Sequence, residues 1–120
     1  MWIPDLRLVV IDAGHEKHSE LDTSSYEAML ARVAWHEWGH ALSVDRADAS
    51  DVKAGSRLLS LAPKGVAGII RSANYGLRDT THELVAEIFA ILMARRRRGQ
   101  TGQPTWLDNE IWELVKRVTG

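Results

Sequence analysis

The segment from Ser24 to Val44 constrains the fold more than any other part of this 120-residue chain. Its apolar residues recur at spacings of three and four, which is the period of an α-helix that buries one face. Ser24 and Glu27 have the spacing of a capping box, so we expect the helix to begin beside Ser24. Midway along this face the residues change from apolar to ionisable: Met29, Leu30, Val33, His36, Glu37, His40, Ala41 and Val44. Such a helix must find partners for the polar groups that it buries.

Two other segments indicate β-structure. Side chains alternate in a period of two at about 6–12, which predicts a strand. The apolar stretches on either side of Pro63-Lys64-Gly65 predict a β-hairpin over 57–70. A strand edge in this hairpin would offer an extended peptide a place to dock.

Two more helices are expected. One runs from Thr80 or Thr81 to Arg97 and ends at Gly99, because glycine readily adopts the left-handed conformation that terminates many helices. The other spans about 105–118 and has one apolar face, formed by Leu107, Ile111, Leu114, Val115 and Val118. Long helices together with a small sheet predict a single α+β domain over residues 1–120.

Composition narrows the chemistry that such a domain can perform. The chain has no cysteine, which excludes disulfides, thiol nucleophiles and thiolate metal sites, so that His, Asp and Glu remain as strong ligands. Its 15 Lys+Arg nearly balance its 16 Asp+Glu, which gives no global attraction to nucleic acid or membranes. The absence of a signal-peptide pattern and of a long apolar stretch favours a cytoplasmic protein.

The pentad His36-Glu37-Trp38-Gly39-His40 has the H-E-x-x-H spacing. Residues four apart are neighbours on a helix, so both imidazoles could bind one metal ion while Glu37 reaches a metal-bound water from the side. The alternative is a surface helix with two solvated histidines. Apolar neighbours on the same helix favour the metal interpretation: Trp35, Trp38, Ala41 and Leu42. Gly39 predicts the close approach of another backbone, because glycine inside a helix costs about 1 kcal/mol relative to alanine.

Two histidines do not complete a catalytic zinc site, which usually has three protein ligands and an open position. Glu83 and Glu87 lie four residues apart in the second long helix, so one could bind the metal while the other accepts the outer N–H of a ligand histidine. The alternative is that Glu83 only caps a helix begun by Thr80 and that Glu87 is a solvated charge. Apolar neighbours of Glu87 argue against that alternative: Ala86, Ile88, Phe89 and Ala90.

These motifs resemble the gluzincin metallopeptidases, in which an H-E-x-x-H helix is paired with a glutamate on a later helix. The likeness is greatest to the catalytic domain of anthrax lethal factor and to minimal gluzincins. It covers about residues 30–118 and is carried by three segments: His36-Glu37-Trp38-Gly39-His40-Ala41, Asn74-Tyr75-Gly76, and Glu83-Leu84-Val85-Ala86-Glu87-Ile88-Phe89. The resemblance implies a zincin-like domain with an active-site helix, a Glu-bearing second helix, a C-terminal helix and a small sheet.

The resemblance also implies roles for individual residues. His36, His40 and Glu83 would bind Zn²⁺. Glu37 would be the general base and Tyr75 would stabilise the oxyanion. Glu87 would support a ligand histidine from outside the metal's own ligand set.

A second likeness points to a different third ligand. His36 to Leu42, the Pro63-Lys64-Gly65 turn and Asn109-Glu110-Ile111 resemble the peptidase domain of the membrane-anchored AAA proteases. That family takes its third ligand from an aspartate near the start of a later helix, which here would be Asp108 or Glu110. The Gly-Gly-Arg-Ala-Ala-Glu segment typical of that family is absent, so the gluzincin likeness ranks higher.

We therefore expect a zinc-dependent endopeptidase that acts on a peptide or an unfolded protein, with no nucleic-acid or membrane partner. The alternative is a non-catalytic or latent zinc-binding module, regulated by a partner or inhibited by its own terminal segment.

Overall fold

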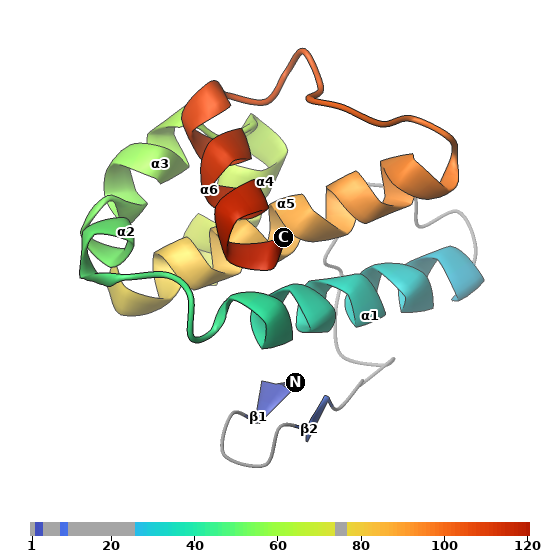
Figure 1. Cartoon of the computed structure of the whole chain (residues 1–120), viewed down its shortest axis with the longest axis horizontal. Helices are drawn as coiled ribbons and strands as arrows, with labels where there is room; N and C mark the ends of the chain where they lie inside the picture. The colour runs from blue at the N-terminus through green and yellow to red at the C-terminus, as the bar shows by residue number, and fades with distance from the viewer. Residues whose placement is uncertain (1, 4–7, 10–25, 74–76) are drawn as a thin grey trace.

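The computed structural model describes residues 2–3, 8–9, 26–73 and 77–120. Within these ranges the chain forms six helices, which are α1 (Tyr26–Ser43), α2 (Ala49–Lys53), α3 (Gly55–Leu61), α4 (Lys64–Ser72), α5 (Leu77–Arg97) and α6 (Asn109–Thr119). Two strands of two residues each, β1 (Trp2–Ile3) and β2 (Leu8–Val9), pair antiparallel. The architecture of the described part is therefore helical (Figure 1).

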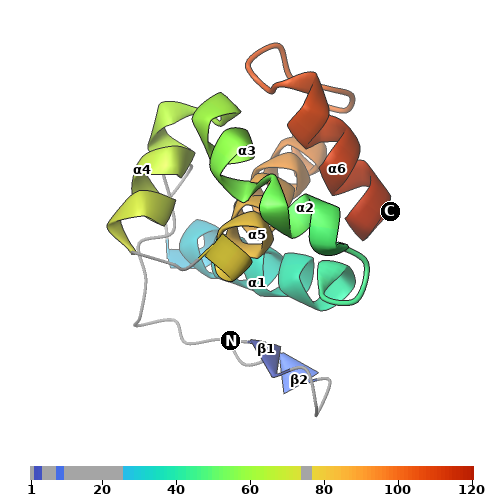
Figure 2. The same cartoon turned by 90° about the vertical axis from the view of Figure 1, so that its left-hand side faces the viewer.

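Helix α5 is the central element, and it contacts each of the other five described helices. Figure 2 shows α5 end-on in the middle of the molecule, with α1, α3, α4 and α6 arranged around it. The middle of α5 is apolar on nearly every side, as expected for a buried helix. Its residues 84–91 are all buried, and four of them have no exposed surface: Leu84, Ala86, Ile88 and Ala90.

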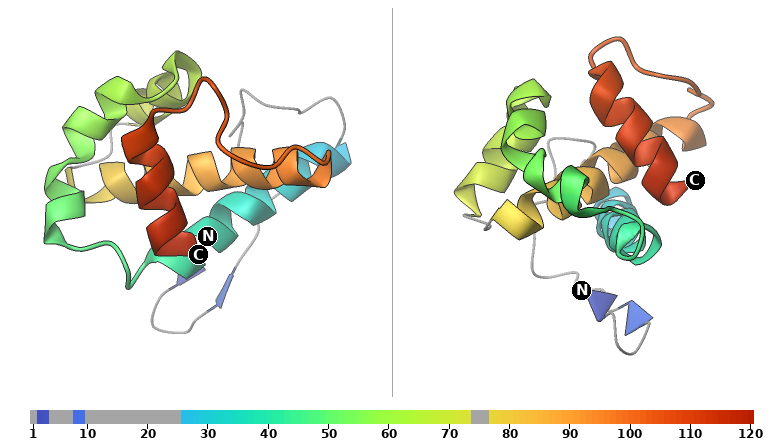
Figure 3. Two further views of the ribbon diagram at one scale, coloured as in Figure 1. Left: turned by 45° about the horizontal axis from the view of Figure 1, so that its top comes forward. Right: turned by 60° about the vertical axis from the view of Figure 1, so that its left-hand side comes forward.

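Helix α6 closes the core beside α3 and packs against both α5 and α1. The predicted apolar face is buried; it consists of Leu107, just before the helix, and Ile111, Leu114, Val115 and Val118 within it. The helix begins later than expected, at Asn109, because the Asp108 side chain caps it by accepting from the backbone N–H of Glu110 at 2.8 Å. Its C-terminal end crosses toward the end of α1 (Figure 3), where Arg46 donates to the backbone oxygen of Gly120 at 3.0 Å.

The predicted β-hairpin over 57–70 is wrong, because this segment forms helices α3 and α4. Pro63 separates the two helices as the N-cap of α4, and its fixed φ suits a helix start as well as a turn. Three residues of α4 are buried at helical spacing: Val66, Ala67 and Ile70. For apolar stretches this short, the local sequence pattern fits a strand or a helix, and packing in the core decides which one forms. A substrate-docking strand edge at this position is therefore also wrong.

The α+β class is wrong for the same reason. Of the strand expected at about 6–12, the described part is β2, which pairs with β1 over two residues. The hydrophobic core identified among the described residues takes its members from α3, α4, α5, α6 and the residue Leu107 before α6. A two-residue ladder supplies no sheet face to this core, so the domain is built on helix packing.

The long helices follow the sequence more closely. Helix α1 covers the predicted segment, although the capping residue Ser24 lies outside the described residues. Helix α5 begins at Leu77, three residues before Thr80, so that Thr80 lies inside the helix and cannot start a capping box with Glu83. The helix ends as expected near Gly99, which has a φ of +79°. None of the described helices is long and apolar enough to cross a membrane.

Helices α1 and α5 run antiparallel (Figure 1). They come together at Gly39, which confirms the predicted close approach of another backbone. A Cβ atom at position 39 would lie 3.1 Å from the Cα of Ala86 and 3.1 Å from Cδ2 of Phe89. Both distances are shorter than ordinary carbon–carbon contact. The missing side chain therefore lets the two helices come together.

Gly39→Ala should lower the free energy of unfolding by about 1 kcal/mol, because overpacking costs about 1–3 kcal/mol and outweighs the roughly 1 kcal/mol gained in helix propensity. Gly68→Ala is the matched control. Gly68 lies inside α4 with no atom within 4 Å of its added Cβ, so this variant should gain about 0.5–1 kcal/mol. Urea unfolding measures both. Equal stabilisation by the two substitutions would contradict the close contact.

Candidate metal centre

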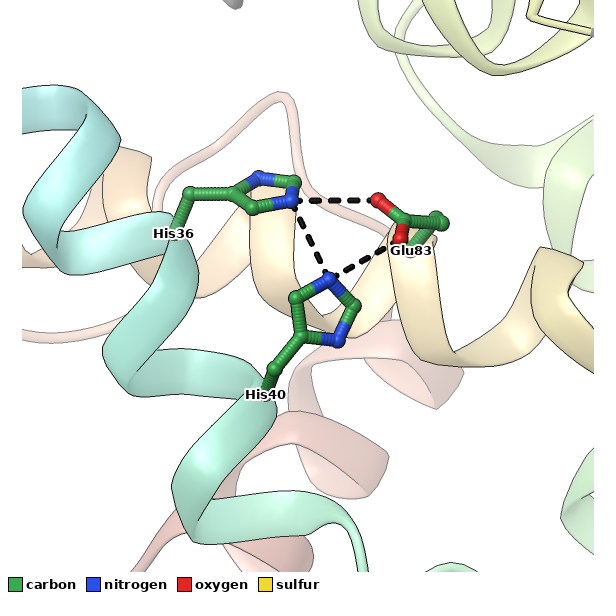
Figure 4. A group of neighbouring side chains, drawn as sticks. All are labelled: His36, His40 and Glu83. Carbon is green, nitrogen blue, oxygen red and sulfur yellow. Dashed lines mark hydrogen bonds and ion pairs between the residues drawn. The ribbon is translucent and has the colours of Figure 1, made fainter. Parts of the chain in front are cut away.

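Three side chains from the two central helices converge on one point (Figure 4). His36 and His40 lie one turn apart on α1 and direct their Nε2 atoms toward Glu83 of α5. His36 Nε2 lies 3.1 Å from Glu83 Oε2, and His40 Nε2 lies 2.9 Å from Glu83 Oε1. The two Nε2 atoms are 3.2 Å apart. Among the described residues, this is the one group of His, Asp and Glu side chains close enough to hold a metal ion.

The three side chains differ in how deeply they lie in the protein. The side chain of His36 is 4% exposed, whereas those of His40 and Glu83 are 17% and 16% exposed. The interior side of the group is therefore closed, and the side formed by His40 and Glu83 is open to solvent.

The electrostatics couple these groups strongly. Burial lowers the pKa of His36, but its hydrogen bond to Glu83, the carboxylate of Glu87 beside Nδ1 and the charges of both carboxylates outweigh this and raise the pKa to about 9. Burial raises the pKa of Glu83, but its hydrogen bonds to His36 and His40 and their charges hold the pKa well below its usual range. Glu83 is therefore an ionised acceptor at neutral pH.

The three short contacts cannot all be hydrogen bonds. Each Nε2 carries either one proton or one lone pair, and an ionised carboxylate only accepts. If both nitrogens donate to Glu83, the 3.2 Å separation between them joins two donors. If one nitrogen carries no proton, its lone pair faces the carboxylate. A cation between the three groups would meet every lone pair at once, so this group could hold a metal ion.

Glu87 lies one turn after Glu83 and is 2% exposed, so the alternative that it is a solvated charge is wrong. Its Oε1 atom lies 3.6 Å from Nδ1 of His36, the ring nitrogen that faces away from Glu83. Its Oε2 atom accepts from Nη2 of Arg32 at 2.9 Å. The structure thus places Glu87 beside the outer nitrogen of His36. That Glu87 supports a ligand histidine stays a prediction.

Arg32 is a site residue that the sequence did not predict; it is 3% exposed, and its side chain reaches from α1 to Glu87 of α5. The sequence did contain a sign that Arg32 lies near the site, because Arg32 precedes His36 by four residues and so lies on the same face of the helix. An arginine in a helix is usually solvated, however, and nothing in the local pattern distinguishes a buried one.

The other predicted site residues lie elsewhere or are not described. Glu37 follows His36 on α1 and is half-buried. Asp108 caps α6 and Glu110 pairs with Arg57, so neither belongs to the His36, His40 and Glu83 group. Tyr75 lies outside the described residues. Two features that carried the likeness to the AAA proteases are therefore absent from the described residues: the hairpin around Pro63, and an Asp108 or Glu110 side chain beside the two histidines.

Comparisons of the chain with protein-family models, with curated proteins and with solved structures found no match. The resemblance to gluzincins therefore depends on the motifs themselves and on the geometry of this group.

The raised pKa of His36 makes the stability of the metal-free protein depend on pH. A group whose pKa is raised on folding contributes stability that is complete below its ordinary value of 6.5 and is lost as the pH rises to about 9. The free energy of unfolding, measured by urea titration with a chelator present, should therefore fall between pH 6.5 and pH 9. His36→Gln removes the titrating group and should flatten this slope. A wild-type stability that stays constant over this range would contradict the charged His36–Glu83 pair.

Proposed function

We propose that this chain is a zinc-dependent endopeptidase in which His36, His40 and Glu83 bind the metal. The single observation that carries the proposal is the convergence of both Nε2 atoms on the carboxylate of Glu83. Two imidazoles and one carboxylate form a ligand set of catalytic zinc sites, which leave the fourth position for water or substrate. The H-E-x-x-H spacing supplies the additional glutamate that peptide hydrolysis requires.

The spacing of the ligand atoms fits zinc. Bonds of about 2.0–2.1 Å in tetrahedral geometry separate neighbouring ligand atoms by about 3.3 Å. The two Nε2 atoms are 3.2 Å apart, close to this value. Each faces a different oxygen of Glu83, at 3.1 Å from His36 and 2.9 Å from His40, and one of these oxygens would serve as the ligand atom. The ligand set consists of imidazole nitrogen and carboxylate oxygen, which zinc accepts readily.

Zinc bound here would polarise the scissile carbonyl and lower the pKa of a bound water to about 7. Side chains of the protein would accept and donate the proton of the attacking water. Glu37 would accept a proton from the attacking water and pass it to the leaving amine. It follows His36 directly and therefore lies about 100° around the helix from it, beside the ligand face and not within the ligand set. Tyr75 would donate to the developing oxyanion.

The exposure of the ligands supports a site that is accessible from one side. His40 and Glu83 are partly exposed, so a peptide could approach past these two side chains. The buried side is occupied by the ion pair of Arg32 and Glu87. The substrate that we propose is a peptide or an unfolded protein. The small helical scaffold has little surface around the site with which to bind a folded substrate.

The first expected outcome concerns metal binding. The wild-type protein should bind one Zn²⁺ per chain, and His40→Gln and Glu83→Gln should each weaken binding by about 100-fold or more, because each removes a ligand. A competition titration against a chromophoric chelator measures the affinity. Glu110→Gln is the matched control, since Glu110 lies outside the group and should leave the affinity unchanged. Tight zinc binding by Glu83→Gln would refute the third ligand.

The second expected outcome separates catalysis from metal binding. Glu37→Gln should keep zinc but lose about 10²–10⁴-fold in the rate of cleavage of an unfolded protein such as casein, because the proton acceptor is gone. Glu113→Gln, an exposed substitution on α6, should retain the wild-type rate. If the wild-type protein binds zinc and leaves casein intact, the chain is a non-catalytic or latent zinc module.

A further inference from the structure

The most unusual charged group outside the three ligands is the guanidinium of Arg32. Arg32 is 3% exposed and lies at the interface of α1 and α5. Removing a charged group from water is costly, and a buried ion pair is often no more stabilising than two apolar side chains of similar size. Stability alone is therefore a weak reason for an arginine at this position.

The contacts of Glu87 give a more specific reason. One carboxylate oxygen, Oε2, accepts from Arg32 Nη2 at 2.9 Å. The other, Oε1, faces Nδ1 of His36 at 3.6 Å. Arg32 thus holds one oxygen in a charge-assisted hydrogen bond and leaves the other facing the histidine. Because Arg32 and His36 lie four residues apart on α1, the same helix positions both partners of the carboxylate.

The orientation of His36 matters because a metal ion needs the lone pair of Nε2. This nitrogen is free of its proton only when Nδ1 carries the ring proton, and an acceptor beside Nδ1 favours that tautomer. The acceptor must also stay in place when the ring binds the metal.

We infer that Arg32 is a positioning residue that fixes the Glu87 carboxylate against Nδ1 of His36 and so presents Nε2 of His36 to the metal. The inference rests on the proposed zinc site, although it does not require peptidase activity. It assigns the Arg32–Glu87 pair to metal binding and not only to the packing of α1 against α5.

The test is a cycle of Arg32→Gln, Glu87→Gln and the double variant, with zinc affinity measured by chelator competition. Each single variant should weaken zinc binding by about 10–100-fold, the range typical of groups that orient a metal ligand. The double variant should bind no more weakly than Glu87→Gln, because Arg32 acts through that carboxylate. Wild-type affinity in Arg32→Gln, or additive losses in the double variant, would overturn the inference.

Two further measurements separate positioning from general destabilisation. Arg46→Met is the control for loss of a positive charge, since Arg46 is exposed and contacts only the C-terminal end of the chain in the interactions described; it should bind zinc as the wild type does. Substitution of Co²⁺ for zinc gives a visible absorption spectrum, which should change in Arg32→Gln even at saturating metal. An unchanged spectrum would indicate a structural role and would count against the inference.

If Arg32→Gln does not fold, Arg32→Lys is the variant that tests the inference. It keeps the charge but offers Glu87 a single flexible ammonium group. It should weaken zinc binding by about threefold or more in the wild-type background and by nothing further in the Glu87→Gln background. Unchanged affinity in both backgrounds would overturn the inference. A wild-type protein that binds no zinc would instead refute the proposed function.

Discussion

The close contact between α1 and α5 at Gly39 is the constraint on which the rest of the structure depends. A Cβ at this position would lie 3.1 Å from the backbone of Ala86, so the two helices could not approach as they do with any larger residue. Their separation in turn fixes how far His36 and His40 are from Glu83, because all three side chains bridge the same interface. A single missing methyl group therefore helps to set distances of about 3 Å between atoms of different helices.

The same interface holds an unusual amount of charge. Arg32, His36, Glu83 and Glu87 all lie between the two helices, beside apolar residues of α5 that have no exposed surface. A helix pair built only for stability would fill such an interface with apolar side chains, since buried charges repay their desolvation only with good geometry. Strongly perturbed pKa values of the kind found at His36 and Glu83 cluster at functional sites. The charge in this interface agrees with the metal site proposed above.

The sequence predicts the long helices and the shared face of His36 and His40, because these depend on regular spacing along a helix. Such spacing does not decide which distant carboxylate meets this face, so Glu87, Asp108 and Glu110 stayed open beside Glu83. The fold class could not be predicted in the same way. Residues 57–70 combine short apolar stretches with Gly65, Gly68 and Pro63, a pattern that fits a hairpin and a pair of short helices equally well, and packing against α5 decides between them. The role of Arg32 was also hidden, because its partner Glu87 is 55 residues away and only the folded interface shows that both are buried.

The three candidate ligands differ in burial, and this divides the group into an inner half, His36, and an outer half, His40 and Glu83. His36 is closed off by Glu87 and Arg32, so in the proposed site the inner half would hold the metal from the side away from solvent. His40 and Glu83 are partly exposed, so the outer half alone can exchange water or meet another molecule. A metal ion held between these halves would be fixed from behind and reachable from the front, which is the division that an open fourth position requires. The asymmetry arises because α5 packs its most buried turn, around Glu87, against His36 and its less buried turn, around Glu83, against His40.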